Sequence, residues 1–273
     1  MEQEKTISFI GAGNMAGALI RGLLSTDSYR ADQILASDIR ADRLKELQSG
    51  LGIKTTSDNR AAAVHGDVVV LSTKPQDFPK LLPEIAPSLR IDSVVLSIAA
   101  GVPISSIEAR LKSGSRVVRA MPNTPALVAT SATALAKGSH ATQQDLDVAK
   151  AIFNSVGVAI SVDESLLDAV TGLSGSGPAY VFAFIEALRD AGNEMGLAKE
   201  EAQKLVIQTV LGSVKLLIET GRDPASLREM VTSPGGTTFA GLKALAAGGF
   251  NQIILNAVKS ATGRSKELGK TLG

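Results

Sequence analysis

The chain has 273 residues, of which 44% are hydrophobic and 20% are charged. This apolar content is enough for one large core or two ordinary ones, so a disordered chain is excluded. The 28 basic and 27 acidic side chains leave a net charge of +1, too little to hold a polyanion, so nucleic-acid binding is not expected. The sequence contains no Cys, which excludes disulfides, thiolate catalysis and Cys-ligated metal centres.

Neither a signal peptide nor a membrane span is expected. The first five residues are polar and acidic, and the apolar run that follows them stops at Gly11. The most apolar stretch, residues 179–187, contains Glu186 and is shorter than the ~18 apolar residues that a membrane helix needs. These patterns predict a cytoplasmic protein without a membrane anchor.

The first half of the chain alternates short, β-branched runs with amphipathic stretches. The runs predict strands at residues 6–10, 33–37, 67–72, 93–98 and 116–121, with two more at 131–136 and 156–162. The stretches between them predict helices at residues 15–24, 43–47, 78–89, 104–111 and 143–154. Continuous apolar strands alternating with helices indicate an α/β domain, whose doubly wound, mainly parallel sheet is covered by helices on both faces.

After residue 162 the strand signals stop and Ala- and Leu-rich helical patterns take over. Helices are predicted at residues 179–195, 200–219, 225–231, 238–247 and 252–268. We therefore expect two domains, residues 1–162 and an all-helical part at 163–273. The segment 179–188 is apolar nearly all round and needs burial on several sides. This favours a homo-oligomer formed through the helical part; burial against the first domain is the alternative.

A glycine-rich turn follows the first predicted strand and opens the first predicted helix. Its sequence at residues 11–16, GAGNMA, is the G-x-G-x-x-A form of a dinucleotide-binding fingerprint. Gly11 permits a tight turn, Gly13 lets the backbone approach a pyrophosphate, and the small Ala16 lets the helix lie close to the strand. The first helical amides then face the phosphate charge. A plain glycine-rich turn is the alternative, but this position favours a bound dinucleotide.

The end of the second predicted strand contains opposing signals about the cofactor. Asp38 is suited to the ribose 2′-hydroxyl of NAD, whereas Arg40 is suited to the 2′-phosphate of NADP. Because a carboxylate repels a phosphate, Asp38→Ala is expected to shift the preference towards NADPH. The alternative is that Asp38 caps the next helix and Arg40 is solvated. Loops at residues 72–76, 99–101 and 121–125 follow other strands, and together they favour a cofactor channel.

Two glycine clusters lie in the helical half. Residues 173–178 (LSGSGP) do not fit a serine-hydrolase elbow and predict a turn before a helix. Residues 233–238 (SPGGTT) place two glycines and two hydroxyls at a helix start, which makes an anion site suited to a carboxylate; an ordinary loop is the alternative. His65 and His140 are expected at the surface, and no metal site is expected.

Six motifs in this order resemble those of pyrroline-5-carboxylate reductases. They are GAGNMA at 11–16, KPQ at 74–76, SIAAGV at 97–102, RAMPNTP at 119–125, GLSGSGPAY at 172–180 and SPGGTT at 233–238. The resemblance spans nearly the whole chain and implies a dinucleotide-binding Rossmann domain followed by a helical dimerisation and substrate domain, often in a larger assembly. It implies reduction of 1-pyrroline-5-carboxylate to L-proline, the last step of proline biosynthesis, with NADPH preferred and NADH also accepted.

The resemblance also implies site residues. Together with Arg40, the cofactor contacts would be Ile10, Gly11, Ala12, Gly13, Asn14, Met15, Asp38, Asn59, Ser72, Thr73, Lys74, Pro75, Ile98, Ala99 and Ala100. The substrate contacts would be Ser233, Gly235, Gly236, Thr237 and Thr238. Thr238 would be the catalytic residue, holding the ring nitrogen by a hydrogen bond and relaying its proton.

Two other functions remain as alternatives, and the first is a dehydrogenase of small hydroxy acids. β-Hydroxyacid dehydrogenases place a catalytic Lys six residues after the first Gly of a G-x-G turn, but counting from Gly175 reaches Val181 here. An imine substrate explains the missing base, because its ring nitrogen can enter the site already protonated. A sensor or scaffold that binds the dinucleotide without turnover is the second alternative.

Overall fold

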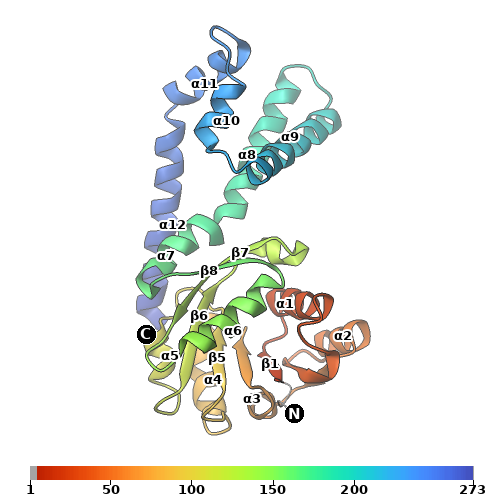
Figure 1. Cartoon of the computed structure of the whole chain (residues 1–273), viewed down its shortest axis with the longest axis vertical. Coiled ribbons are helices and arrows are strands. Elements are labelled where there is room, and N and C mark those ends of the chain that lie inside the picture. The colour runs from red at the N-terminus through yellow and green to blue at the C-terminus, as the bar shows by residue number, and fades with distance from the viewer. Residues whose placement is uncertain (1–4, 273) are drawn as a thin grey trace. The chain divides into compact units, whose positions relative to one another are not determined.

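The structure, a computed structural model, describes residues 5–272 (Figure 1). Most of the polar start considered above, residues 1–4, therefore lies outside the described part. The chain forms two compact units: unit 1 is Met1–Ser176 with Lys259–Gly273, and unit 2 is Gly177–Val258. The single boundary expected after residue 162 thus differs from the division by compactness, which assigns residues 163–176 and the last turns of the chain to unit 1.

In the described part of the chain, unit 1 contains one eight-stranded sheet of order β3-β2-β1-β4-β5-β6-β7-β8. Neighbouring strands are parallel except β6 and β7, which are antiparallel. The strands are β1 (Ile7–Ile10), β2 (Ile34–Ser37), β3 (Lys54–Thr56), β4 (Val68–Leu71), β5 (Val94–Ser97), β6 (Arg116–Met121), β7 (Ser131–Lys137) and β8 (Gly157–Ser161). The predicted doubly wound, mainly parallel sheet is confirmed.

Helices cover both faces of this sheet. One buried cluster joins the sheet to α1 (Asn14–Ser25), α2 (Ala41–Leu51) and α6 (Gln143–Asn154). The other joins the opposite face to α3 (Asn59–His65), α4 (Phe78–Ile85) and α5 (Ile104–Glu108). Every residue of β1, β4 and β5 is buried, because a central parallel strand is enclosed on both sides. This enclosure explains why these strands are continuous apolar runs in the sequence.

Several elements of unit 1 were not predicted, among them one strand and one short helix. Strand β3 has the sequence Lys-Thr-Thr at the sheet edge, where its side chains are exposed or half-buried, so it lacks an apolar signal. Helix α3 spans seven residues and buries only Ala62 and Ala63. The helix predicted over 78–89 ends at Ile85. Of the two histidines, His140 is exposed, whereas His65 is half-buried with its Nε2 3.2 Å from the Gln33 carbonyl oxygen.

The turn predicted at residues 173–178 is wrong. Residues Thr171–Gly175 form a π-helical segment between α7 (Leu167–Val170) and α8 (Gly177–Glu194), with the Ser176 amide donating to the Thr171 carbonyl at 2.8 Å. A Cβ on Gly175 would lie 2.5 Å from the end of the Met121 side chain, so this glycine lies close to the end of β6. A π-bulge that depends on such a tertiary contact has no signature in the local sequence.

Unit 2 is helical. It contains α8, α9 (Lys199–Thr220), α10 (Pro224–Met230) and α11 (Thr237–Ala247), together with the start of α12 (Phe250–Leu272). Large apolar side chains of α8 and α9 remain exposed in the single chain, including Phe182 at 62% and Ile218 at 76%. No helix within residues 5–272 combines the length and the apolar character that crossing a bilayer requires.

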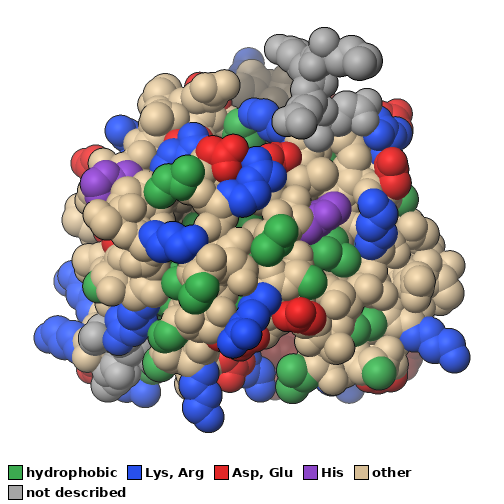
Figure 2. Space-filling view, turned by 90° about the horizontal axis from the view of Figure 1, so that it is seen from below, with side chains coloured by type: hydrophobic (Ala, Val, Ile, Leu, Met, Phe, Trp, Pro, Cys, Tyr) green, Lys and Arg blue, Asp and Glu red, His purple; other side chains and the backbone are tan. Residues whose placement is uncertain are grey.

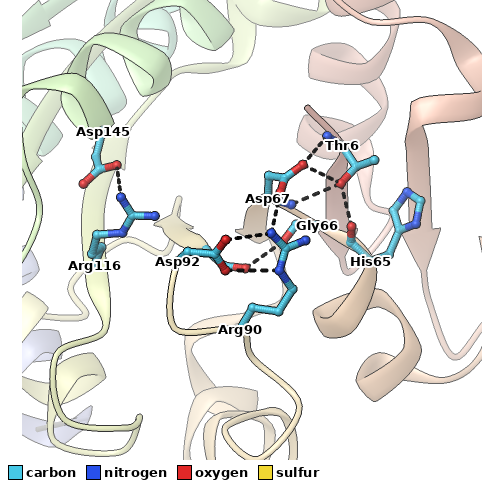
Figure 3. A network of polar contacts seen from close by, with 9 residues as sticks. Thr6, His65, Gly66, Asp67, Arg90, Asp92, Arg116 and Asp145 are labelled. Carbon is cyan, nitrogen blue, oxygen red and sulfur yellow. Dashed lines mark hydrogen bonds and ion pairs between the residues drawn. The ribbon is translucent and has the colours of Figure 1, made fainter. Parts of the chain in front are cut away.

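A polar network ties together the amino-terminal ends of the central strands (Figure 3). The Asp67 carboxylate accepts hydrogen bonds from the Thr6 amide at 2.7 Å and the Thr6 hydroxyl at 2.9 Å, and from Arg90 Nη2 at 2.8 Å. Burial favours a higher pKa for Asp67, but these hydrogen bonds and the Arg90 charge hold the pKa below its ordinary value. Arg90 also pairs with the exposed Asp92 at 2.9 Å. Charges of both signs intermingle on the face at the bottom of Figure 1, which Figure 2 shows.

We expect Asp67→Asn to lower the free energy of unfolding by about 1 kcal/mol at pH 7. A carboxyl whose folded pKa lies below its unfolded value of about 3.9 stabilises the fold above that value. The stabilisation is lost as the pH falls through the lowered folded pKa, so the difference between variant and wild type should shrink as the pH falls below the unfolded value and vanish below the folded pKa. Denaturant unfolding across this pH range measures the effect. Asp92→Asn is the exposed control, and an equal loss there would contradict the role of burial.

Candidate active site

The predicted cofactor residues gather at the carboxyl ends of four adjacent strands. Strand β1 leads into the glycine-rich turn, β2 into Asp38, β4 into Ser72 and β5 into Ile98. In the sheet these strands are neighbours in the order β2-β1-β4-β5, so the chain reverses its direction of winding between β1 and β4. Ligands of open α/β sheets bind outside the strand ends at such a point. The predicted cofactor residues therefore lie where a sheet of this kind binds its ligand.

Gly11 packs against backbone on two sides. Its φ is +94°, and a Cβ there would lie 2.8 Å from the Ser72 carbonyl carbon and from the Thr73 amide nitrogen. The Gly11 amide donates to the Ser37 carbonyl at 2.8 Å, and the Ser72 hydroxyl donates to the Gly11 carbonyl at 2.6 Å. The turn is thus fixed between the ends of β2 and β4, where no larger residue fits.

The space beyond Gly13 suits a phosphate group. A Cβ on Gly13 would meet no atom within 4 Å, so the backbone is open on that side. Helix α1 begins directly after Gly13, without a side-chain cap and without an acidic residue in its first turn. Its first amides and its positive end are therefore available to an anion. Thr73, whose amide nitrogen lies beside Gly11, has a buried hydroxyl without a hydrogen-bond partner among residues 5–272. This is expected if a ligand supplies the partner.

Asp38 supports the glycine-rich turn by a hydrogen bond to its backbone. Its carboxylate accepts from the Ala12 amide at 2.8 Å and from the Arg40 amide at 2.9 Å, and its side chain is only 10% exposed. Burial favours a higher pKa for Asp38, but the two amides and the Arg40 guanidinium hold it below its ordinary value. Asp38 does not cap α2, whose N-cap is Arg40. Arg40 itself is largely exposed and available to a ligand phosphate.

Arg43 is a site residue that the sequence analysis missed. Its Nε donates to the Ala12 carbonyl at 2.7 Å and its Nη2 to the Gly13 carbonyl at 3.4 Å, so the guanidinium braces the turn. A Cβ on Gly17 would lie 2.5 Å from the same Nη2, so the glycine after Ala16 leaves room for the guanidinium in this position. That glycine was the available signal, because it marks a position where α1 leaves room for a neighbour.

The remaining loops of this edge are held by the sheet. Asn59 begins α3 and accepts from the Ser37 hydroxyl at 3.0 Å. The Ile98 amide donates to the Leu71 carbonyl at 3.2 Å, while Lys74 is exposed. Asn123 is fully engaged: its side chain accepts from Ser131 and Ala132 and donates to Ser174. The loop at 121–125 therefore supports the π-helical segment.

The predicted substrate residues form one exposed loop of unit 2. The Gly236 amide donates to the Ser233 carbonyl at 3.0 Å, and Gly235 has φ +71°, so Ser233–Gly236 is a type II turn with Pro234 at its second position. Helix α11 starts at Thr237 with no side-chain cap and no acidic residue in its first turn. Thr238 is exposed. The turn thus presents amides and hydroxyls without a negative charge, as a carboxylate requires.

Two known protein families match two different parts of the chain. The family described as pyrroline-5-carboxylate reductase dimerisation matches residues 164–268. The family described as NADP oxidoreductase, coenzyme F420-dependent, matches residues 6–101. The first match contains all of unit 2, and the second contains the glycine-rich turn and the loops after β2, β4 and β5.

Curated relatives and solved structures match over nearly the full length. The pyrroline-5-carboxylate reductase of Methanosarcina acetivorans is 46% identical, covering 99% of this chain and 100% of that protein. That of Pseudomonas aeruginosa is 42% identical, covering 98% of each. A solved pyrroline-5-carboxylate reductase from Coxiella burnetii has a TM-score of 0.92 at 39% identity, covering 97% and 99%. The Plasmodium falciparum enzyme, solved with NADP bound, has a TM-score of 0.87 at 32% identity, covering 98% and 99%.

Both halves of the described chain, and nearly all of its length, thus match one group of proteins in sequence and in structure. The six sequence motifs, including the turn after β1 and the exposed loop before α11, all lie within the length that these relatives match. Taken together with the identities of 46% and 42%, they show that this chain belongs to the pyrroline-5-carboxylate reductase family.

Proposed function

We propose that this chain reduces 1-pyrroline-5-carboxylate to L-proline, the last step of proline biosynthesis, with NADPH as the preferred and NADH as an accepted hydride donor. The observation that carries this proposal is the chemistry of the 233–238 loop. It offers backbone amides and hydroxyl groups but no imidazole or ammonium group. Such a loop suits a carboxylate beside a ring nitrogen, whereas oxidation of an alcohol needs a base.

The carboxyl edge of the sheet would hold the dinucleotide. When bound, NADPH would supply the hydride. The first amides of α1 and the open backbone at Gly13 would bind its pyrophosphate, and the exposed Arg40 would bind the 2′-phosphate. The hydroxyl of Thr73 and residues 98–100, two of which are the small Ala99 and Ala100, would border the nicotinamide half.

The loop before α11 would orient the imine. Its amides and the positive end of α11 bind the carboxylate, and Thr238 holds the ring nitrogen by a hydrogen bond. Because the ring nitrogen can enter protonated, the carbon that accepts hydride is already electron-poor and no strong acid is needed. Holding the reacting atoms about 3–3.5 Å apart then accounts for most of the acceleration.

The proposed assembly is a dimer through the helical unit, with dimers joining into larger oligomers. It is supported by the dimerisation-family match and by the exposed apolar side chains of α8 and α9. The proposed location is the cytoplasm, which supplies the reduced cofactor that the reaction consumes. No nucleic-acid partner is proposed, since the chain has a net charge of +1.

A steady-state assay tests the activity. We expect purified protein to oxidise NADPH when 1-pyrroline-5-carboxylate is added, with L-proline formed in equal amount. The same preparation supplied with NADP⁺ and small hydroxy acids should show no reduction of the cofactor. Binding of NADPH without turnover of the imine would favour a sensor or scaffold, and oxidation of a hydroxy acid would favour a dehydrogenase; either result contradicts the proposal.

Thr238→Ala should lower kcat by about 10- to 100-fold, because the ring nitrogen loses its hydrogen-bonding partner in the reacting geometry. The Kd of NADPH should stay unchanged, since the dinucleotide is bound elsewhere. Thr238→Ser retains the hydroxyl and should recover most of the activity. Fluorescence titration of NADPH and initial rates measure the two quantities. A parallel loss of cofactor affinity would rule out a role confined to the substrate.

The contacts of Asp38 change the expected effect of removing it. Asp38→Ala deletes the acceptor for the Ala12 amide, so it should weaken NADPH and NADH binding alike, by about 5- to 30-fold. Arg40→Ala should weaken NADPH binding about tenfold and leave NADH binding unchanged. Titrating both variants with both cofactors provides the comparison. If Asp38→Ala instead favours NADPH over NADH, repulsion of the 2′-phosphate is its main role.

A further inference from the structure

The last turns of α12 lie against the loop that follows β5. Gly101, in this loop, has φ +74°, and a Cβ there would lie 3.3 Å from the Leu268 Cβ and 3.4 Å from the Gly269 amide nitrogen. Conversely, a Cβ on Gly269 would lie 2.9 Å from the Gly101 carbonyl oxygen. Helix and loop therefore meet closely: a side chain at position 269 would press on the Gly101 carbonyl, and the positive φ of Gly101 favours glycine in the loop.

A second contact fixes this end of α12. Ser265 is 4% exposed, and its hydroxyl donates to the Asp168 carboxylate of α7 at 2.6 Å. Leu167, which directly precedes Asp168, is fully buried in the core of unit 1. A short hydrogen bond to a carboxylate is among the stronger polar contacts in a protein. Through α7, the end of α12 is thus anchored to the core of unit 1.

The loop is held at its two ends by hydrogen bonds and in part by the core of unit 1. At its start, the Ala99 amide donates to the Ser97 hydroxyl at 3.3 Å. At its end, the Ile104 amide donates to Glu164 at 2.7 Å, and Arg119 pairs with the same carboxylate at 3.1 Å. Between these points Val102 is buried in the core, whereas Ala100 and Gly101 have little or no side chain with which to make contacts. The α12 end supplies the support at Gly101.

We propose that Ser265 and Gly269, at the end of α12, are positioning residues that set the loop 98–101 against the nicotinamide half of the cofactor. This inference rests on the proposed function, in which residues 98–100 contact that half. It assigns a role in hydride transfer to helical residues more than 160 positions away from the loop. Because small errors in the placement of reacting atoms cost much of the rate, the support is expected to matter in turnover.

A pair of glycine-to-alanine variants of the full chain tests the inference. Gly269→Ala and Gly263→Ala both lie in α12 and both favour a helix. A Cβ at 263 meets nothing within 4 Å, whereas a Cβ at 269 must displace the Gly101 carbonyl or the helix. For Gly269→Ala we expect kcat to fall about 5- to 20-fold and the Kd of NADPH to rise about threefold. Gly263→Ala should match wild type in both.

A cofactor fragment separates positioning from general damage. 2′-Phosphoadenosine 5′-diphosphate contains only the adenine half, so its Kd should be unchanged in Gly269→Ala. If this Kd rises as much as that of NADPH, the role is structural and the inference fails. It also fails if Gly269→Ala behaves like Gly263→Ala.

Ser265→Ala removes the anchor to Asp168 without adding volume, and it serves if Gly269→Ala does not fold. We expect the same pattern with a smaller amplitude: weaker NADPH binding, unchanged fragment binding and lower kcat. Unchanged values for Ser265→Ala would contradict the role of that residue. If wild type binds NADPH but does not reduce 1-pyrroline-5-carboxylate, the proposed function fails, while the two binding constants still decide whether α12 supports the loop.

Discussion

The close approach of Gly11 to the backbone of Ser72 and Thr73 is the constraint on which the candidate site depends. It joins the ends of β1 and β4 where the sheet changes direction. With Gly11 fixed, the open side of Gly13 and the bare start of α1 are presented together. A side chain at position 11 would separate the two strand ends, and the remaining contacts of this edge would no longer converge.

Charged side chains hold this turn from beneath. The Asp38 carboxylate accepts a hydrogen bond from the Ala12 amide, and the Arg43 guanidinium donates to the carbonyl oxygens of Ala12 and Gly13. An acid and a base thus satisfy opposite polar groups of the same turn, so neither is simply a ligand for the cofactor. Arg40 remains as the exposed charge at the end of β2. We therefore assign the choice of cofactor to Arg40 and the shape of the glycine-rich turn to Asp38 and Arg43, although all three lie in one short segment.

The sequence predicted what depends on local pattern and missed what depends on distant contacts. Central strands such as β4 were clear because burial on both faces requires an unbroken apolar run. Strand β3 has no such run, and the π-helical segment before α8 is shaped by Met121, far from it in the sequence. The glycine motifs indicated both loops of the proposed site. The bracing by Arg43 is marked in the sequence only by Gly17, and the contact of Gly101 with Gly269 has no local signature, since it exists only once the chain has folded.

The return of α12 to unit 1 means that the two functional halves are not separable modules. A fragment ending at residue 162 would keep every strand of the sheet but would lose Glu164, leaving the buried Arg119 without its carboxylate. It would also lose Leu167 from the core and bare the back of the loop at Gly101 to water. Recombination that grafts this dinucleotide-binding half onto another protein must therefore carry the far end of the chain with it.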